Sequence, residues 1–247
     1  MLKISNFEVM GWEHAVRGMR NPKNSWDKTD SLFKEIAEID ILEDGVVHKQ
    51  QVYFDALSLG ENDHKLMVTL RNAGTDHRKF MRMITVYVDL TAPLYWWKEF
   101  DTYKVGSVAN SCSTMHKIHA KEFELEDFSC EHLMTLSQQE IPYHSNVPYA
   151  FDYREIMRTV IDALNTARGY FLETKDKKYW WQMIQLLPTS YNQKRTVMLN
   201  YEVLANIYKS RRHHKLDEWH TLCDWIEELP YSELITGVEH EVDDVSM

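Results

Sequence analysis

Regular spacing of apolar residues divides the chain into a series of short elements. Between residues 151 and 174, apolar positions from Ile156 to Ala167 recur every three or four residues, which predicts one face of a long helix. Ile84–Leu90 alternates β-branched and aromatic residues with polar ones at a period of two, which predicts a strand. These two segments are the clearest elements of the sequence.

The same two periods predict further elements along the chain. Helices are expected at Trp12–Met19, Asp30–Ile39, Asn62–Ala73, Leu94–Tyr103, Tyr179–Leu187, Tyr201–Arg211 and Leu216–Leu229. Strands are expected at Val46–Phe54, entered through a turn at Glu43–Gly45, and at Arg195–Leu199. The serine-rich stretch from 105 to 118 fits neither period. The sequence therefore predicts a mainly helical α+β fold with a small sheet and several long helices, in one domain over residues 1–247.

Charge and composition narrow the classes of function. The chain has 28 Lys and Arg against 38 Asp and Glu, a net charge of −10, which disfavours binding to duplex nucleic acid or to an anionic membrane. No run approaches the roughly 20 apolar residues of a membrane helix, and Met1–Asn6 lacks the apolar run of a signal peptide. Three widely spaced cysteines predict free thiols and a cytoplasmic location.

Two polar clusters are candidates for chemistry. Lys209–Lys215 is a basic run at the end of a predicted helix, and it reads either as an anion pocket or as a solvated helix terminus. Asn110–Thr114 places hydroxyl groups beside the thiol of Cys112, which indicates either phosphate binding with a possible nucleophile or a polar cap with an inert thiol. The pair His116 and His119 has metal-ligand spacing without a third ligand, so no metal site is predicted.

A series of short motifs follows the order found in the flavin-dependent thymidylate synthases. The motifs are Ala15-Val16-Arg17, Ser25-Trp26-Asp27, His64-Lys65-Leu66-Met67, Gly74 with His77, Thr91-Ala92-Pro93 after the strand, Leu187-Pro188, and Thr196–Asn200 followed by Leu204, Asn206 and Arg211. The chain resembles this family from about Phe7 to about Leu229. The resemblance implies the fold of that family as a single domain, and reductive methylation of dUMP with FAD, NADPH and methylene-tetrahydrofolate. It also implies a homotetramer with active sites between subunits.

The resemblance implies a set of site residues, most of them by matched position. His214 lies one position short of a flavin-contacting histidine of the family, and Arg82 lies beside Met83, which stands where the family has another. Flavin contacts are implied for Ser25, His77, Lys104, Ser107, Asn110, Asn200, Asn206 and His214. Contacts to the pyrimidine nucleotide are implied for Arg211, Ser113 and Arg82, and catalytic roles for Arg211, Ser113 and Cys112. The family has a signature motif of Arg-His-Arg, followed after about seven residues by Ser, any residue and Arg. Either Cys112 or Ser113 matches the serine of this motif, depending on whether one residue is inserted before it.

The same comparison leaves more than one function open. The Arg-His-Arg of the family motif is replaced by Thr102-Tyr103-Lys104, so one cation remains of two, and the arginine before the Leu-Pro pair is Ile184. One reading is a flavin-dependent methylase of a pyrimidine nucleotide. A second is a diverged nucleotide-binding or scaffold protein that keeps the fold without flavin chemistry. A third is an enzyme in which the thiol of Cys112 adds to a pyrimidine ring.

Overall fold

The structure is a computed structural model that describes residues 1–43, 46–139 and 150–237. Within the hairpin that follows residue 31, only the backbone is described for 35–43, 46–48 and 51–56. The expected turn at Asp44 and Gly45 lies outside the described residues.

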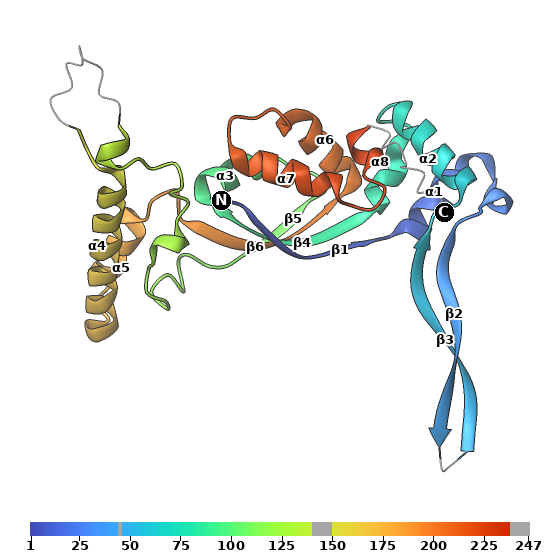
Figure 1. Ribbon diagram of the computed structural model, residues 1–247, viewed down its shortest axis with the longest axis horizontal. Coiled ribbons are helices and arrows are strands. Elements are labelled where there is room, and N and C mark those ends of the chain that lie inside the picture. Colours follow the sequence, from blue (N-terminus) through green and yellow to red (C-terminus); the bar gives the residue numbers. More distant parts are fainter. Residues whose placement is uncertain (44–45, 140–149, 238–247) are drawn as a thin grey trace.

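A four-stranded antiparallel sheet forms the centre of the molecule (Figure 1). Its strands are β1 (Lys3–Met10), β4 (Thr85–Pro93), β5 (Val108–Ser111) and β6 (Asn192–Asn200), in the spatial order β1-β4-β6-β5. Strand β4 lies between β1 and β6, with Val88 opposite Val197. The alternation that predicts β4 has its physical basis here, because Val86, Val88 and Leu90 are all buried.

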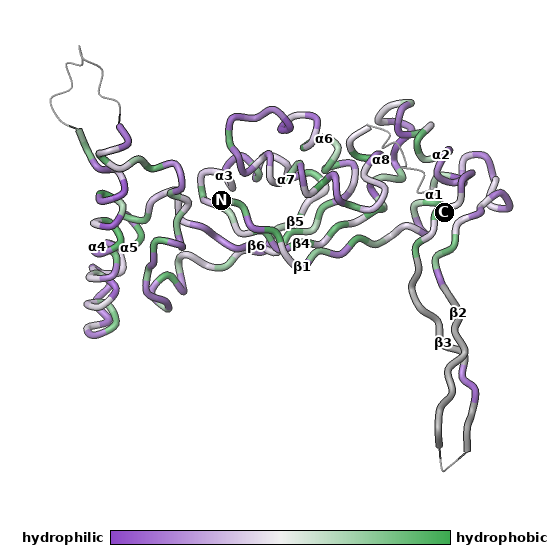
Figure 2. The backbone as a smooth tube through the Cα atoms, viewed as in Figure 1, coloured by the Kyte–Doolittle hydropathy of each residue, from purple (hydrophilic) through white to green (hydrophobic). Residues whose placement is uncertain are grey.

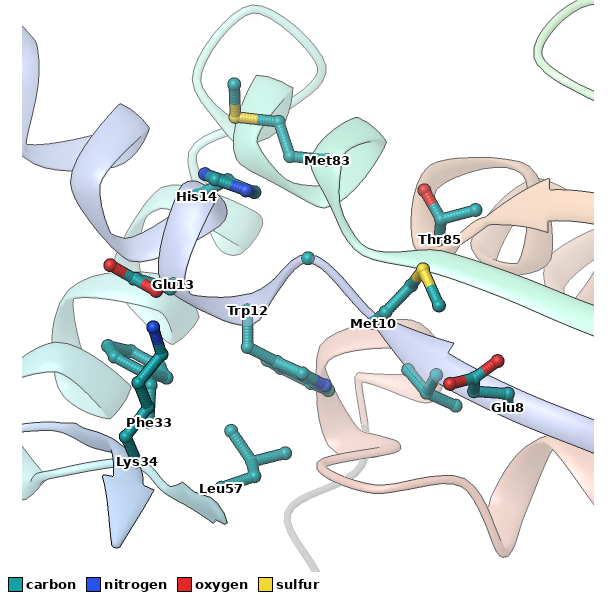
Figure 3. A pocket seen from close by; sticks show the side chains of 12 residues that line it. Glu8, Met10, Trp12, Glu13, His14, Phe33, Lys34, Leu57, Met83 and Thr85 are labelled. Carbon is teal, nitrogen blue, oxygen red and sulfur yellow. The ribbon is translucent and has the colours of Figure 1, made fainter. Parts of the chain in front are cut away.

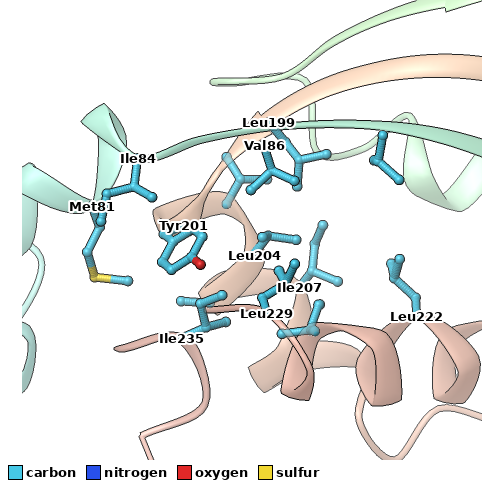
Figure 4. Packing of buried hydrophobic residues seen from close by; sticks show 14 of the residues in the cluster. Met81, Ile84, Val86, Leu199, Tyr201, Leu204, Ile207, Leu222, Leu229 and Ile235 are labelled. Atoms are coloured by element: carbon cyan, nitrogen blue, oxygen red, sulfur yellow. The ribbon is translucent and has the colours of Figure 1, made fainter. Parts of the chain in front are cut away.

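Four helices pack on one face of this sheet. They are α3 (Leu94–Phe100), α6 (Tyr201–Arg211), α7 (Asp217–Glu227) and α8 (Glu233–Thr236). In Figure 4, Leu204 and Ile207 of α6 lie between the strand residues Val86 and Leu199 and Leu229, which follows α7. The main core is therefore a sheet with a single helical layer.

The opposite face of the sheet is more polar. Strand alternation places Tyr87 and Asp89 of β4 there, with Thr196 and Lys194 of β6 beside them in register. Asp89 accepts hydrogen bonds from Thr196 Oγ1 at 2.6 Å and Asn6 Nδ2 at 3.0 Å, and pairs with Lys194 Nζ at 2.8 Å. The Lys194 ammonium, followed by the hydrogen bonds from Thr196 and Asn6, holds the pKa of Asp89 well below its usual range.

Two helices form a second, smaller core at one end of the molecule. Helix α4 (Tyr153–Thr174) packs along α5 (Lys177–Leu186), and both stand beside the end of the sheet in Figure 1. The members of this core include Ile161, Leu164 and Met183, together with Phe123 and Phe128 from the preceding irregular segment. Hydrophilic and hydrophobic residues alternate around α4 in Figure 2, as the helical period predicts.

A hairpin and two helices form the other end of the molecule. Helices α1 (Trp12–Arg20) and α2 (Glu61–Asn72) flank the base of the two-stranded sheet of β2 (Leu32–Glu43) and β3 (Val46–Ser58). The hairpin projects from the body as a long twisted ribbon (Figure 1).

The sequence prediction is wrong for one helix and incomplete for two strands. Residues 30–39 were expected to be helical, but 32–39 lie in β2, where Ile36 pairs with Tyr53 and Ile39 with Gln50. Apolar residues three positions apart suit either element over a short run, and pairing with β3 decides the outcome. Strands β1 and β5 were not predicted at all. The other expected helices and strands are present with ends shifted by a few residues, and helix α3 ends at Phe100.

The described part of the chain contains no helix that is long and apolar enough to cross a membrane. All three cysteines are free thiols, with Cys112 exposed and Cys130 and Cys223 buried. Burial raises the pKa of the Cys223 thiol to about 11 and also raises that of Cys130.

Candidate functional site

A small cavity lies where the end of α3 approaches the start of β5 and the middle of β6. Its volume is about 220 Å³. It is lined by Phe100, Asp101, Tyr103, Lys104, Ser107, Ala109 and Arg195. Two cations against one carboxylate give this cavity a net positive charge, which suits an anionic ligand.

Arg195 is fixed on the wall of this cavity. Its Nη1 donates to Asp101 Oδ1 at 2.8 Å and its Nε to Gln193 Oε1 at 3.1 Å. The guanidinium carbon lies 4.1 Å from the centroid of the Trp97 ring, within the range of a cation–π contact. Arg195 shares the helix-covered face of β6 with the buried Val197, which is why its side chain turns toward α3.

Lys104 and Ser107 belong to the loop that follows α3. This loop contains Gly106 in the left-handed region, with φ of 83°. A Cβ at Gly106 would lie 3.1 Å from Asn200 Nδ2, so the loop packs closely against the first residues of α6. The Ser107 hydroxyl donates to the Tyr103 carbonyl oxygen. The structure thus brings Lys104, Ser107 and Asn200 into one region, as the resemblance implies.

The side chain of Asn200 stabilises the start of α6 and the loop around Gly106. Its Oδ1 accepts a hydrogen bond from Val203 N at 3.0 Å and caps α6, while its Nδ2 donates to Gly106 O at 3.3 Å. Both ends of this amide are therefore used within the chain.

Arg211 lies next to the cavity, in a cluster of its own. Its Nη1 pairs with Glu99 Oε2 at 2.9 Å and its Nε donates to Tyr103 Oη at 3.0 Å. The same Glu99 oxygen receives Trp219 Nε1 at 3.1 Å and lies 3.3 Å from His214 Nε2. The charge of Arg211 is therefore compensated by Glu99, and Tyr103 connects this cluster to the cavity.

Three expected site residues lie away from the cavity face. Asn110 pairs with Thr196, and Cys112 continues the strand with its N–H donating to Lys194 O at 2.9 Å, so both follow the register of the open face of the sheet. Ser113 comes after the strand, where its Oγ accepts a hydrogen bond from His116 N at 3.0 Å. Within one chain these residues do not line the Lys104–Arg195 cavity.

Another three lie at the hairpin end of the molecule. Ser25 lies in the loop after α1, and its carbonyl oxygen accepts a hydrogen bond from Arg20 Nη1 at 3.2 Å. His77 and Arg82 are exposed at either end of the 3₁₀ helix Arg78–Met83. A further expected flavin contact, Asn206, does not lie at the hairpin end but is exposed on α6. The expected flavin contacts are thus distributed over separate parts of one chain.

A larger cavity of about 670 Å³ opens between β1, the start of α1 and the base of the hairpin (Figure 3). Trp12 lies between Glu8 on one side and Glu13 and Lys34 on the other in this view. Two carboxylates face one ammonium among its lining residues, so this cavity is less suited to a phosphate than the one at Lys104.

No group of three or more His, Cys, Asp or Glu among the residues that the structure describes could hold a metal ion. The lining of the Lys104–Arg195 cavity offers two cations, one carboxylate and the hydroxyl groups of Tyr103 and Ser107. Sequence reasoning missed Arg195 and Glu99. For Arg195 a signal was available. It lies two residues before the buried Val197, so strand alternation places both side chains on the same face of β6.

Comparisons with known proteins place the fold. No protein family model matches the sequence, and no curated protein sequence matches it. Among solved structures, flavin-dependent thymidylate synthase ThyX from Helicobacter pylori, complexed with FAD and dUMP, is similar with a TM-score of 0.59 and 14% identity. The match covers 95% of this chain and 97% of that one.

A second solved structure has a comparable likeness. The UMP/dUMP methylase PolB from Streptomyces cacaoi, bound with 5-Br dUMP, gives a TM-score of 0.55 at 14% identity and covers 96% of this chain and 94% of that one. At this identity the likeness establishes the fold. The chain therefore has the α+β fold of the flavin-dependent thymidylate synthase type, which confirms the fold class predicted from the sequence.

Proposed function

We propose that this protein is a flavin-dependent enzyme that methylates, or otherwise adds one carbon unit to, a pyrimidine nucleotide such as dUMP. The observation that carries the proposal is the net positive cavity of Lys104 and Arg195 beside Arg211, on a fold whose solved relatives hold FAD with dUMP or bind 5-Br dUMP. NADPH and methylene-tetrahydrofolate are the expected cosubstrates.

The residues beside the cavity would bind and orient the nucleotide. Arg211 offers hydrogen-bond donors to its base or phosphate, held in position by Glu99 and Tyr103. Lys104 and Arg195 supply positive charge. Reduced FAD, when bound, supplies the hydride, so the protein needs no nucleophile of its own on this reading.

The flavin site would be built from more than one subunit. The expected flavin contacts Ser25 and His77 lie at the hairpin end, whereas Lys104 lies in the loop after α3. A homotetramer with intersubunit sites would bring them together. Ser107, Asn110, Asn206, His214, Ser113 and Cys112 remain proposed contacts on the same basis.

Release of tritium from the ring tests the proposal directly. The purified protein is mixed with FAD, NADPH, methylene-tetrahydrofolate and dUMP or UMP labelled with tritium at the ring carbon that would receive the new group. Release that requires both flavin and the one-carbon donor supports the proposal. Absence of release with either nucleotide, from a protein that retains FAD, would refute the proposed reaction.

A second candidate is a nucleotide-binding protein without flavin chemistry. Two observations favour it. Arg211 is already neutralised by Glu99, and of the family's Arg-His-Arg only the last position keeps a cation, Lys104. This candidate predicts binding of dUMP by a protein that takes up no FAD.

The hypothesis that the thiol of Cys112 adds to a pyrimidine ring can be tested separately. Cys112 is exposed, whereas the other two thiols are buried. Alkylation of the native protein with iodoacetamide should modify Cys112 first. If the thiol adds to the ring, dUMP will protect it and alkylation will abolish turnover; if it does not, alkylation will be unaffected by dUMP.

A further inference from the structure

The two basic groups beside α3 differ in how their charge is used. In the Lys104–Arg195 cavity, two cations face one carboxylate, that of Asp101. In the Arg211 cluster, one guanidinium faces one carboxylate, that of Glu99. The Lys104–Arg195 cavity therefore retains a net positive charge, whereas the charges of the Arg211 cluster cancel.

We infer that the phosphate of the nucleotide lies against Lys104 and Arg195, and that Arg211 faces the uncharged base. This inference rests on the proposed function for the identity of the ligand. It adds Arg195, which no resemblance indicates, as a binding residue, and it divides the nucleotide between two subsites.

Arg195 is preorganised for an anion. Asp101 and Gln193 hold Nη1 and Nε, and the Trp97 ring supports the plane of the guanidinium. No described group accepts a hydrogen bond from the remaining nitrogen, Nη2, on a residue that lines the cavity. A guanidinium with one edge fixed and one nitrogen left can bind a phosphate oxygen with little loss of side-chain entropy.

Lys104 supplies the second charge. Its side chain is exposed, and the described residues include no carboxylate in an ion pair with it. Ser107 is a weaker donor, because its hydroxyl hydrogen is used in the bond to the Tyr103 carbonyl. The anion is therefore bound mainly by the two cations.

Arg211 suits a neutral acceptor. One oxygen of Glu99 receives Arg211 Nη1 and Trp219 Nε1, so the carboxylate is held beside the guanidinium. A phosphate dianion placed at Arg211 would approach that carboxylate and be repelled. A carbonyl oxygen of a pyrimidine carries no net charge and meets no such repulsion.

Tyr103 sets the distance between the two subsites. Its hydroxyl accepts from Arg211 Nε at 3.0 Å, and its side chain lines the Lys104–Arg195 cavity. The subsites are thus one tyrosine side chain apart. A nucleoside monophosphate, in which a sugar separates base and phosphate, can bridge them.

Binding of dUMP and of deoxyuridine, which lacks the phosphate, separates the two subsites. The measurement is isothermal titration calorimetry on the full chain, with inorganic pyrophosphate as a third probe. Lys104→Gln and Arg195→Gln should each weaken dUMP about tenfold, as expected for a charge-assisted hydrogen bond, and leave deoxyuridine within about twofold. Arg211→Gln should weaken both ligands by the same factor.

Lys194→Gln is the matched control. It removes the same charge from the neighbouring residue of β6 on the opposite face of the sheet, and it should leave every ligand within about twofold. Lys104→Gln changes an exposed loop residue, so the test stands even if Arg195→Gln is poorly folded. Unchanged dUMP affinity in Lys104→Gln, or loss of the preference for dUMP over deoxyuridine in Arg211→Gln, would overturn the inference.

Pyrophosphate distinguishes failure of the inference from failure of the proposed function. If the wild type binds pyrophosphate but neither dUMP nor deoxyuridine, and Lys104→Gln abolishes that binding, the anion subsite stands and the pyrimidine function is wrong. If the wild type binds dUMP and Lys104→Gln binds dUMP and pyrophosphate equally well, the function stands and the subsite is wrong. If the wild type binds none of the three, both are wrong.

Discussion

The base of the hairpin and the Lys104–Arg195 cavity both contain an arginine held by an aspartate. At the hairpin base, Arg20 is 4% exposed and Asp63 is fully buried, and they meet at 2.6 Å. At the cavity, Arg195 is 15% exposed and its partner Asp101 is 46% exposed. The first pair is closed to ligands, whereas the second leaves a cation at a surface opening.

In the closed pair, every nitrogen of the Arg20 guanidinium donates a hydrogen bond within the chain. Arg20 also donates to the carbonyl oxygens of Ser25 and Lys28, and Asp63 receives further bonds from Thr29 Oγ1 and Ser31 Oγ. This network fixes the loop between α1 and the hairpin. An arginine is therefore evidence for a ligand only when part of its donor set is left over, as at Arg195.

The largest effect is expected from breaking the closed pair. Arg20→Gln leaves the buried Asp63 carboxylate without its cation and should lower the free energy of unfolding by about 3–5 kcal/mol. Glu61→Gln, at an exposed residue of the same helix α2 as Asp63, should leave it nearly unchanged. Urea denaturation measures both. Equal effects of the two variants would contradict the structural role of the pair.

The closed pair also predicts a loss of stability in acid. Burial alone would raise the pKa of Asp63, but hydrogen bonds from Thr29, Ser31 and Arg20 outweigh it and hold the pKa below the ordinary value. A lowered pKa in the folded state means that this stabilisation is complete above the unfolded pKa near 4 and is lost as pH falls through the folded pKa. Asp63→Asn should remove this part of the pH dependence. Parallel curves of unfolding free energy against pH for variant and wild type would contradict it.

The open pair should matter less to stability. Arg195→Gln removes a partly exposed ion pair and the contact with Trp97, and should cost about 1 kcal/mol, several times less than Arg20→Gln. The same denaturation experiment measures it. A cost equal to that of Arg20→Gln would mean that Arg195 is a structural cation and would remove the reason to assign it a ligand.

The smallest effect on stability is expected at Lys104. Lys104→Gln should change the free energy of unfolding by less than about 0.5 kcal/mol, because the exposed ammonium has no carboxylate partner among the described residues. Its effect should instead appear in the salt dependence of dUMP binding, which becomes shallower when one phosphate contact is removed. Titrations at several salt concentrations test this, with Lys194→Gln expected to keep the wild-type slope.

Periodicity alone was sufficient for the best-buried elements. Strand β4 and helix α4 have one buried side each, so their apolar residues follow the period of the element. Strand β1 is an edge strand in which most residues are exposed, and it gives no such pattern. Strand β2 was predicted as a helix because its pairing with β3, which decides its conformation, is not visible in local spacing.

The candidate site was predictable only in part. The loop residues Lys104 and Ser107 were named from the resemblance, and the structure places both at one cavity. Arg195 was not named, because its relevance depends on the end of α3 reaching β6. Arg211 was named, but its compensation by Glu99 depends on contacts among α3, α6 and α7 that one sequence does not reveal.

Flavin uptake tests the central claim most directly. The purified protein is mixed with excess FAD, dialysed, and examined by absorbance spectroscopy alongside a sample that received no FAD. A flavin absorbance band that survives dialysis, in a protein that also binds dUMP, is the predicted result. A protein that stays colourless after the same treatment would contradict the flavin-dependent mechanism and favour the diverged nucleotide-binding protein.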